Sequence, residues 1–198
     1  MSARFIAFEG GDASGKTTQA RRVADRLDAL FTREPGGTHL GEMLRTLVLE
    51  PEHEVDLRAE ALMIAAARAQ HVAEVVRPAL DGGRDVVTDR FTASSLAYQG
   101  FGSGLPVAEV RSLSVFATDD LWPVLTVLID VPVEVAMGRL DGSPDRFESE
   151  ADAFHERVRA GYLQLAAEDD SWVVIDGSGS LDEVSALVDA AMADRLGL

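Results

Sequence analysis

A glycine-rich segment near the N-terminus carries residue types that are suited to binding phosphate. Residues 10–17 read G-G-D-A-S-G-K-T and fit the pattern G-x-x-x-x-G-K-[ST]. In this pattern the glycines let backbone N–H groups wrap around phosphate oxygens, Lys16 reaches the β and γ phosphates, and the Thr17 hydroxyl can ligate Mg²⁺. A glycine-rich turn that only starts a helix is the alternative. The predicted ATP-binding residues are Gly10, Gly11, Asp12, Ala13, Ser14, Gly15, Lys16, Thr17 and Thr18.

Two acidic residues and one arginine could act beside phosphate bound on this loop. Asp12 lies inside the loop, where a carboxylate is unfavourable next to phosphate unless it serves a ligand or a cation; otherwise it bonds its own loop backbone. Asp89 and Arg90 follow an apolar, strand-like run, and the end of a buried strand is where a parallel sheet presents functional side chains. A structural ion pair between these two neighbours is the alternative.

A polar stretch late in the chain, residues 141–145, combines turn-forming residues and has an arginine on either side. Phosphoryl transfer needs positive charge around the moving group, and a segment that closes over the site commonly delivers this charge. If both arginines were only surface charges, Lys16 would be the main cation at the γ phosphate, which is insufficient. We therefore predict a short lid at about residues 139–149, with Arg139 and Arg146 as its cationic residues.

The order of the predicted elements indicates how these residues are held. Short apolar runs alternate with segments of helical spacing, which implies a parallel sheet with helices on both faces and ligands at the carboxyl ends of its strands. We predict a single α/β domain over residues 1–198, with a doubly wound, five-stranded parallel sheet of the P-loop NTPase type. The predicted strands are 5–8, 30–32, 85–88, 124–129 and 172–175. The predicted helices are 16–30, 40–49, 58–80, 93–98, 106–117, 134–139 and a last helix after the fifth strand.

The composition argues against several classes of partner and site. The 198 residues include 18 Lys or Arg and 34 Asp or Glu, which gives a formal net charge of −16. Such a chain repels nucleic-acid polymers and anionic membranes, because both are bound mainly through clustered basic residues. The absence of cysteine excludes disulfides and thiolate sites, and no window approaches the length of a membrane span. We expect a cytoplasmic protein whose partners are small molecules.

A phosphate loop alone does not distinguish a small-molecule kinase from a GTPase, a motor or a regulatory ATPase. The chain carries no Asn-Lys-x-Asp stretch for guanine recognition. Its 198 residues also leave little room for a motor or a separate output domain. A small-molecule kinase is therefore the leading interpretation.

Four further segments give the chain a resemblance to one family. In chain order they are residues 33–38 (REPGGT), 66–70 (AARAQ), 89–100 (DRF followed by SSLAYQG) and 145–148 (DRFE). Together with the phosphate loop, their order and spacing resemble those of bacterial thymidylate kinases, which are P-loop nucleoside monophosphate kinases. The resemblance implies an enzyme that uses ATP and Mg²⁺ to phosphorylate dTMP to dTDP, with ADP as the second product, in dTTP synthesis.

The resemblance implies a role for each matching residue near the phosphates. Asp12 would hold the 3′-hydroxyl of the acceptor sugar, Arg90 would bind the acceptor phosphate, and Asp89 would act near Mg²⁺ together with Thr17. Some family members have an arginine where Ala13 stands in this loop, so the catalytic cation would come from the lid. The catalytic residues would then be Asp12, Lys16, Asp89, Arg90, Arg139 and Arg146.

The same resemblance implies a pocket for dTMP. Arg68 matches the family residue that contacts thymine, while Ser95 and Tyr98 match positions that read the thymine edge and pack against the deoxyribose, where a poor fit would reject a 2′-hydroxyl. Taken without their motifs, Arg33 and Arg68 also fit solvated charges, and Tyr98 fits a half-buried core aromatic. The predicted substrate-binding residues are Asp12, Arg33, Ile64, Arg68, Arg90, Ser95, Tyr98 and Gln99.

Two departures from the family pattern bear on these predictions. Ile64 stands where many thymidylate kinases have a phenylalanine that stacks on thymine, so we expect looser packing against the base. The predicted lid carries no arginine between Arg139 and Arg146, whereas family lids often hold several. The four histidines show no metal-ligand spacing and are expected at the surface or at helix ends rather than in catalysis: His39, His53, His71 and His155.

The resemblance also implies a homodimer. Two other interpretations of the function stay open. The first is a kinase for another nucleotide or for a deoxynucleoside, which the isoleucine at position 64 favours. The second is a regulatory module that binds ATP without turnover, although such a module has no use for a second nucleotide pocket.

Overall fold

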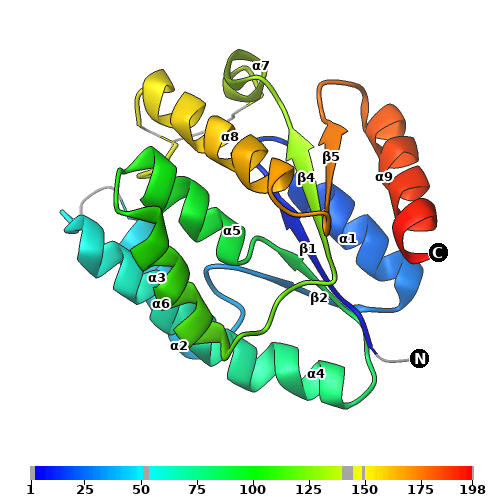
Figure 1. The fold of residues 1–198 in the computed structure, drawn as a ribbon, viewed down its shortest axis with the longest axis horizontal. Helices are drawn as coiled ribbons and strands as arrows, with labels where there is room; N and C mark the ends of the chain where they lie inside the picture. The colour runs from blue at the N-terminus through cyan, green and yellow to red at the C-terminus, as the bar shows by residue number, and fades with distance from the viewer. Residues whose placement is uncertain (1–2, 51–53, 140–144, 149, 198) are drawn as a thin grey trace.

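A five-stranded parallel sheet forms the centre of the molecule, and its strands run in the order β2-β3-β1-β4-β5 (Figure 1). The computed structural model describes residues 3–50, 54–139, 145–148 and 150–197. The predicted fold class is confirmed. The chain places β2 and β3 on one side of β1 and then crosses to the other side, so the end of β1 is the point where ligands bind in such sheets. The strands are β1 (Phe5–Glu9), β2 (Leu30–Arg33), β3 (Val86–Asp89), β4 (Leu125–Asp130) and β5 (Trp172–Asp176).

Helices cover both faces of this sheet (Figure 1). Helices α1 and α9 pack on one face, and the segments α3 to α6 together with α8 pack on the other. The α-helices are α1 (Lys16–Leu27), α2 (His39–Leu49), α3 (Leu57–His71), α4 (Arg77–Asp81), α5 (Thr92–Ser95), α6 (Val107–Thr118), α7 (Val133–Met137), α8 (Asp152–Ala167) and α9 (Leu181–Leu196). Two π-helical segments, η1 (Val72–Val76) and η2 (Leu96–Gly102), continue α3 and α5.

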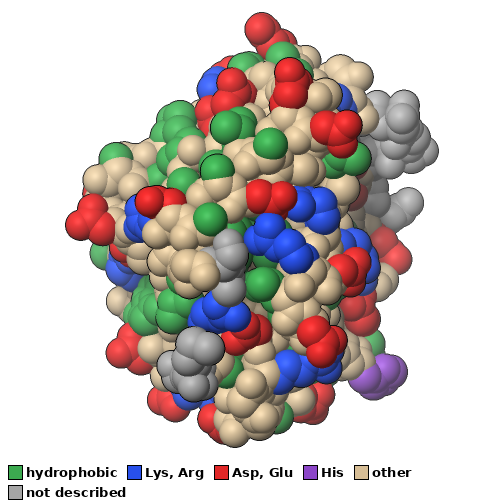
Figure 2. Space-filling view, turned by 90° about the vertical axis from the view of Figure 1, so that its right-hand side faces the viewer, with side chains coloured by type: hydrophobic (Ala, Val, Ile, Leu, Met, Phe, Trp, Pro, Cys, Tyr) green, Lys and Arg blue, Asp and Glu red, His purple; other side chains and the backbone are tan. Residues whose placement is uncertain are grey.

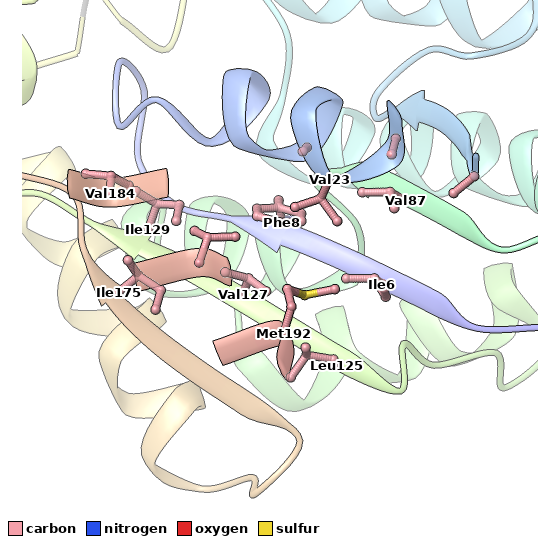
Figure 3. Close-up of a cluster of buried hydrophobic side chains, with 14 of the residues drawn as sticks. Ile6, Phe8, Val23, Val87, Leu125, Val127, Ile129, Ile175, Val184 and Met192 are labelled. Atoms are coloured by element: carbon pink, nitrogen blue, oxygen red, sulfur yellow. The ribbon is translucent and has the colours of Figure 1, made fainter. Parts of the chain in front are cut away.

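The strands are apolar on both faces because helices cover both sides of the sheet. Successive side chains of β1 point to opposite faces. Ile6 and Phe8 are fully buried in the larger core, against α1 and α9 (Figure 3), while Phe5 and Ala7 pack against η1 on the other face. The phosphate loop therefore extends from a strand that is fixed from both sides.

All five predicted strands are present, but several helices differ from the prediction. The segment predicted as one helix over 58–80 is helical throughout but consists of α3, η1 and α4, and the helix predicted over 93–98 is α5 followed by η2. Helix α8 was not predicted, although its buried Phe154, Val158, Tyr162 and Leu165 recur at helical spacing. Of the predicted lid, residues 140–144 and 149 lie outside the described residues.

The surface carries charges of both signs despite the acidic composition. Figure 2 shows acidic side chains spread over one face of the molecule with basic side chains between them. Some of these charges are paired: Asp189 of α9 lies 2.7 Å from Arg22 and 2.5 Å from Arg26 of α1, which ties these two helices together. Among the described residues, no helix has both the length and the apolar character that crossing a membrane requires.

Candidate active site

The predicted phosphate-binding loop connects β1 to α1 at the carboxyl edge of the sheet. Gly10 has a φ of 147°, and a Cβ there would lie 2.5 Å from the carbonyl oxygen of Ile129 in β4, so the position requires glycine. The buried Lys16 donates from Nζ to the carbonyl oxygen of Gly11 at 3.0 Å. Burial and the neighbouring Arg90 guanidinium lower the pKa of the Lys16 ammonium, which favours a negatively charged partner at this point.

Asp12, Arg90 and Tyr98 form a hydrogen-bonded cluster beside the loop. Arg90, with a left-handed φ of 68°, donates from Nη2 to Asp12 Oδ1 and to the Tyr98 hydroxyl at 3.1 Å, and from Nη1 to the carbonyl oxygen of Gly10 at 3.1 Å. The Tyr98 hydroxyl donates to Asp12 Oδ2 at 2.7 Å. Burial alone would raise the pKa of Asp12, but the positive charge of Arg90 holds it below its ordinary value. Arg90 thus pairs with Asp12 and not with its neighbour Asp89, and Asp12 binds side chains instead of its own loop.

A hydroxyl and a carboxylate meet at the start of α1. Thr17 Oγ1 donates to Asp89 Oδ2, while the second carboxylate oxygen of Asp89 is buried and has no hydrogen-bond partner. The hydroxyl of Ser14, inside the loop, is also buried without a partner. Buried polar atoms without a partner are rare in native proteins and need an explanation, such as an ion or a water molecule that completes the bonding. The oxygens present are those that Mg²⁺ prefers.

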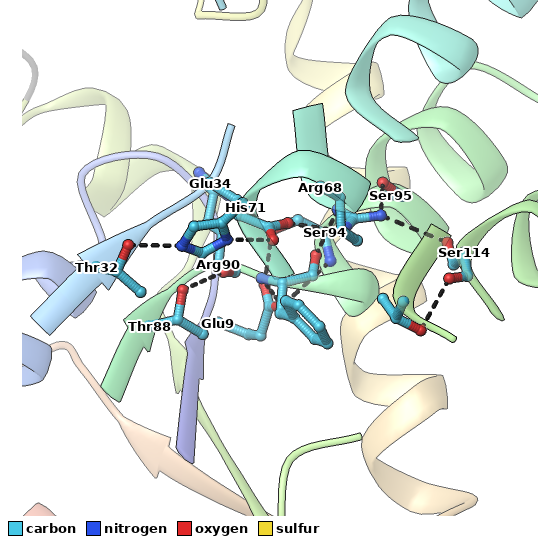
Figure 4. A network of polar contacts seen from close by, with 12 residues as sticks. Glu9, Thr32, Glu34, Arg68, His71, Thr88, Arg90, Ser94, Ser95 and Ser114 are labelled. Atoms are coloured by element: carbon cyan, nitrogen blue, oxygen red, sulfur yellow. Dashed lines mark hydrogen bonds and ion pairs between the residues drawn. The ribbon is translucent and has the colours of Figure 1, made fainter. Parts of the chain in front are cut away.

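A buried carboxylate to which the sequence analysis gave no role, that of Glu9, stabilises the backbone next to Arg90. Glu9, at the end of β1, is fully buried and accepts a hydrogen bond from the Ser94 hydroxyl at 2.6 Å (Figure 4). It also accepts from the Phe91 amide at 2.8 Å and from the Tyr162 hydroxyl at 3.0 Å. Burial raises the pKa of Glu9. These bonds fix the turn that follows Arg90. The available signal was an acidic residue at the end of an otherwise apolar strand.

Arg68 lies in a buried polar network, so the alternative of a solvated helix charge is wrong (Figure 4). Its guanidinium donates to Glu34 Oε2 at 2.6 Å, to the Ser95 hydroxyl at 3.0 Å and to the carbonyl oxygen of Phe91 at 3.0 Å. His71, which we expected at the surface or at a helix end, is the last residue of α3 but is fully buried, and it contacts Glu34 through Nδ1 at 2.9 Å. The network joins the REPGGT segment to α3 and α5.

One pocket gathers seven of the eight predicted substrate-binding residues. Arg33 does not line it, because its guanidinium contacts the carboxylate of Glu42 at 3.0 Å on the surface. The predicted residues that line the pocket are Asp12, Ile64, Arg68, Arg90, Ser95, Tyr98 and Gln99. Its other lining residues, to which the sequence analysis assigned no role, are Glu34, Pro35, Arg45, Leu49, Ser94, Asp145 and Phe147.

Besides Tyr98, the wall of this pocket includes one phenylalanine. Ile64 and Leu49 are aliphatic, but Phe147 also lines the pocket and packs edge-on against Tyr98, with ring centroids 5.5 Å apart. Arg45 and Leu49 reach the pocket from the same face of α2, because residues four apart lie on one side of a helix. The spacing explains why the two side chains lie together, but it does not by itself assign them to the pocket.

The two arginines that flank the predicted lid make contacts away from the phosphate loop. Arg139, just beyond α7, donates to the carbonyl oxygens of Gly177 at 3.0 Å and Ser178 at 3.2 Å, after β5. Arg146 donates from Nε to the carbonyl oxygen of Val48 at 2.7 Å and from Nη2 to the buried carboxylate of Glu60. Their catalytic roles therefore stay a prediction.

The phosphate loop follows the central strand of this parallel sheet, and the pocket with its charged and polar side chains lies beside the loop. Together these features define a P-loop phosphotransferase. The family model described as thymidylate kinase matches residues 8–188, and the chain belongs to the thymidylate kinase family. It is 49% identical over 191 residues to a thymidylate kinase from Chromobacterium violaceum, which covers 92% of this chain and 90% of the relative. It is 46% identical over 200 residues to that of Leifsonia xyli subsp. xyli (97% and 95% covered) and 42% over 207 residues to that of Geobacillus sp. (99% and 99%). The prediction of a thymidylate kinase, a nucleoside monophosphate kinase that transfers a phosphoryl group, is confirmed by this membership.

Proposed function

We propose that the loop over residues 10–17 binds the phosphates of ATP and that the adjoining pocket binds dTMP, with the dTMP phosphate at Arg90. This assignment rests on the position of Arg90 and Asp12 between the phosphate loop and the pocket. Both line the pocket, and Arg90 also bonds to the loop through the carbonyl oxygen of Gly10. An acceptor phosphate at Arg90 would therefore lie next to the γ phosphate of a nucleotide on the loop. ATP and dTMP would be the small-molecule partners, and we place the reaction in the cytoplasm.

Magnesium fits the residues at the start of α1. Thr17 and Asp89 would hold the ion, and the partnerless Oδ1 of Asp89 supports this role. The described residues contain no group of three or more histidine or acidic side chains that could bind a metal alone. Phosphate oxygens and water would therefore complete the coordination, as is usual for Mg²⁺. When bound, the ion would offset the negative charge of the phosphates.

The chemistry requires positioning and charge compensation rather than a covalent intermediate. The dTMP phosphate oxygen would attack the γ phosphorus in line, and the bond from this phosphorus to the bridging oxygen would break, so that ADP leaves. Lys16 and Arg90 would compensate the developing charge. Asp12 orients Arg90 through their ion pair and would meet the 3′-hydroxyl of the sugar. Arg139 and Arg146 would contribute only after the lid rearranges from the contacts described above.

The thymine base would be read by buried polar side chains on α3, α5 and η2. Arg68 is held by Glu34 and Ser95, and Gln99 is held by Glu60 at 2.8 Å, so both side chains that would meet the base edge are preorganised. Tyr98 has a buried ring, consistent with packing against a deoxyribose and rejecting a 2′-hydroxyl. Binding of another nucleotide or a deoxynucleoside is the alternative that substrate tests must exclude.

We further propose that two copies of the chain associate through the surface formed by α3 and α6. Leu62 of α3 is 58% exposed and Phe116 of α6 is 86% exposed. The groove between these helices is lined by further apolar side chains, including Leu105 and Leu113. Exposed apolar residues around one groove are typical of an interface, and a second copy supplies a self-complementary surface.

Replacing Arg90 by lysine tests the assignment of the two sites. Lysine keeps the positive charge but cannot bond to Gly10, Asp12 and Tyr98 together, so we expect kcat/KM for dTMP to fall roughly 100-fold. The matched control is Arg84→Lys, because Arg84 is exposed and lies outside the pocket. The measurement is dTMP-dependent release of ADP. Equal kcat/KM in the two variants would contradict the assignment.

A further inference from the structure

Buried side-chain nitrogen and oxygen atoms without a hydrogen-bond partner lie in one region of the described structure, around the phosphate loop. The described residues contain three of them: Ser14 Oγ, Asp89 Oδ1 and His155 Nε2. The first lies in the phosphate loop and the second lies beside Thr17 at the start of α1. The third belongs to helix α8, which carries no residue to which the proposed reaction assigns a role. His155 is only 6% exposed, so its partnerless nitrogen needs an explanation of its own.

His155 lies on the face of α8 that is turned toward the phosphate loop. Together with Arg159 and Tyr162 it lines a cavity of about 20 Å³ that Gly11 and Asp12 of the loop also line. Most of the remaining lining is apolar and comes from β4, α7 and the connection between them. Residues three, four and seven positions apart share one face of a helix, which explains why α8 presents these side chains together. A cavity of this size admits one water-sized group, such as a single phosphate oxygen.

The other charged groups around this cavity already have partners. Arg159 donates to both carboxylate oxygens of Asp130 at 2.8 and 2.9 Å, at the end of β4. Asp12 is bound by Arg90 and by the Tyr98 hydroxyl. The His155 nitrogen is therefore the group in this wall that is left to meet a ligand, among the residues that the structure describes.

Few cationic side chains contact the phosphate loop in the described structure. The loop has Ala13 next to Asp12 and so carries no cation there. Arg139 binds carbonyl oxygens beyond β5, and Arg146 binds Glu60 on α3. Within the described part of the chain, Lys16 and Arg90 are the cations that contact the loop in this conformation. A further donor beside Gly11 would supply what the loop itself lacks.

We infer that His155 Nε2–H donates a hydrogen bond to a terminal phosphate oxygen of the donor nucleotide, which makes His155 a phosphate-binding residue of the reaction. The inference rests on the proposed binding of ATP at the loop. A phosphate oxygen is an acceptor only, and an imidazole with a proton on Nε2 is a donor that fits it. A hydrogen bond to a charged oxygen is stronger than one to a neutral group. A bond from His155 to bound phosphate would therefore explain why this buried nitrogen has no partner within the protein.

The test compares His155→Leu, which removes the donor at similar volume, with His155→Gln, which offers an amide donor. We expect kcat of the Leu variant to fall roughly 10- to 100-fold while KM for dTMP stays within about twofold, and the Gln variant to recover most of the loss. The control is His39→Leu, because His39 is exposed at the start of α2. It should retain the activity of the parent chain.

Stability of the nucleotide-free chain separates this role from a structural one. A structural histidine would lower Tm when replaced, whereas removal of a partnerless buried nitrogen should leave Tm unchanged or raise it. The rise in Tm caused by Mg²⁺ and a non-hydrolysable ATP analogue should be smaller in the Leu variant than in the parent chain. In NMR spectra of the parent chain, the ring N–H signal of His155 should shift on addition of the analogue but not of dTMP alone. Parallel losses of Tm and kcat in the Leu variant, or an undiminished response to the analogue, would overturn the inference. If the parent chain itself lacks dTMP-dependent turnover, the proposed function fails instead.

Discussion

Glu9 shows how one residue can support a site and oppose folding at the same time. Its carboxylate holds the turn after Arg90 through Phe91, Ser94 and Tyr162, yet it has no solvent contact. Burial raises its pKa, so the folded chain binds a proton at Glu9 more tightly than the unfolded chain does. The stability that this group contributes is complete below the unfolded pKa of about 4.3 and is lost as the pH rises through the higher folded pKa.

Replacing Glu9 by glutamine should remove this pH dependence. We expect the Tm of Glu9→Gln minus the Tm of the parent chain to increase as the pH rises from about 4 to 7. Each kcal/mol of difference in the free energy of unfolding corresponds to roughly 2–4 °C in Tm. Thermal unfolding of the nucleotide-free proteins at several pH values measures this difference. The matched control is Glu134→Gln, because Glu134 is exposed on α7, and it should show no such trend. A difference between Glu9→Gln and the parent chain that is the same at every pH would refute the explanation.

At this scale the sequence allowed the motif residues to be predicted but not their partners. Asp12, Arg90 and Tyr98 do line one pocket, because their motifs place them at the ends of β1 and β3 and on η2. The predicted pocket residue Arg33 instead contacts Glu42, and Arg45 of α2 lines the pocket. Which of two nearby arginines enters a pocket depends on helix packing that no local pattern encodes.

At the scale of elements, the side chain of Arg146 connects the segment 145–148 to both α2 and α3. Arg146 bonds to the carbonyl oxygen of Val48 at the end of α2 and to the carboxylate of Glu60 in α3. The Glu60 side chain is only 1% exposed, whereas that of Arg146 is 18% exposed. Removing the arginine leaves a buried carboxylate without its cation, which is more costly than losing the pair as a whole.

Replacing Arg146 by methionine should therefore lower the free energy of unfolding by roughly 3 kcal/mol. The double variant Glu60→Gln with Arg146→Met should recover most of this loss, because the uncompensated charge is gone and the amide oxygen introduced on α3 can still accept from Gln99. Urea unfolding of both variants measures the recovery, with Arg195→Met, an exposed position on α9, as the control. A double variant that is no more stable than Arg146→Met would contradict this account of the ion pair.

The fold could be predicted well at this scale because each strand is a short apolar run and each connection contains a helix. All five strands were found, and their parallel order follows from the alternation of elements. Helix α8 was missed although its apolar residues have helical spacing, because no motif drew attention to the stretch after residue 148. Its omission also concealed His155 and Tyr162, which reach the site from that helix.

For the molecule as a whole, net charge and exposed apolar surface have opposite effects on association. A formal charge of −16 repels a second copy, while the apolar groove between α3 and α6 favours one. We expect the parent chain to have twice the mass of one chain in light scattering at physiological salt, and Leu62→Glu with Phe116→Glu to shift it to a single copy. Leu181→Glu on α9, which is also exposed, is the control and should remain dimeric. A monomeric parent chain would contradict the proposed interface.

The central claim is that this chain transfers a phosphoryl group from ATP to dTMP. The most direct measurement is ADP release with MgATP and, in separate reactions, dTMP, dUMP, dCMP, dGMP, AMP or thymidine. We predict the highest kcat/KM for dTMP, with dUMP lower by roughly 10-fold or more for the missing methyl group, and no turnover with thymidine, which lacks the phosphate that Arg90 would bind. ADP release that no acceptor stimulates, or that another acceptor stimulates as strongly as dTMP, would contradict the account.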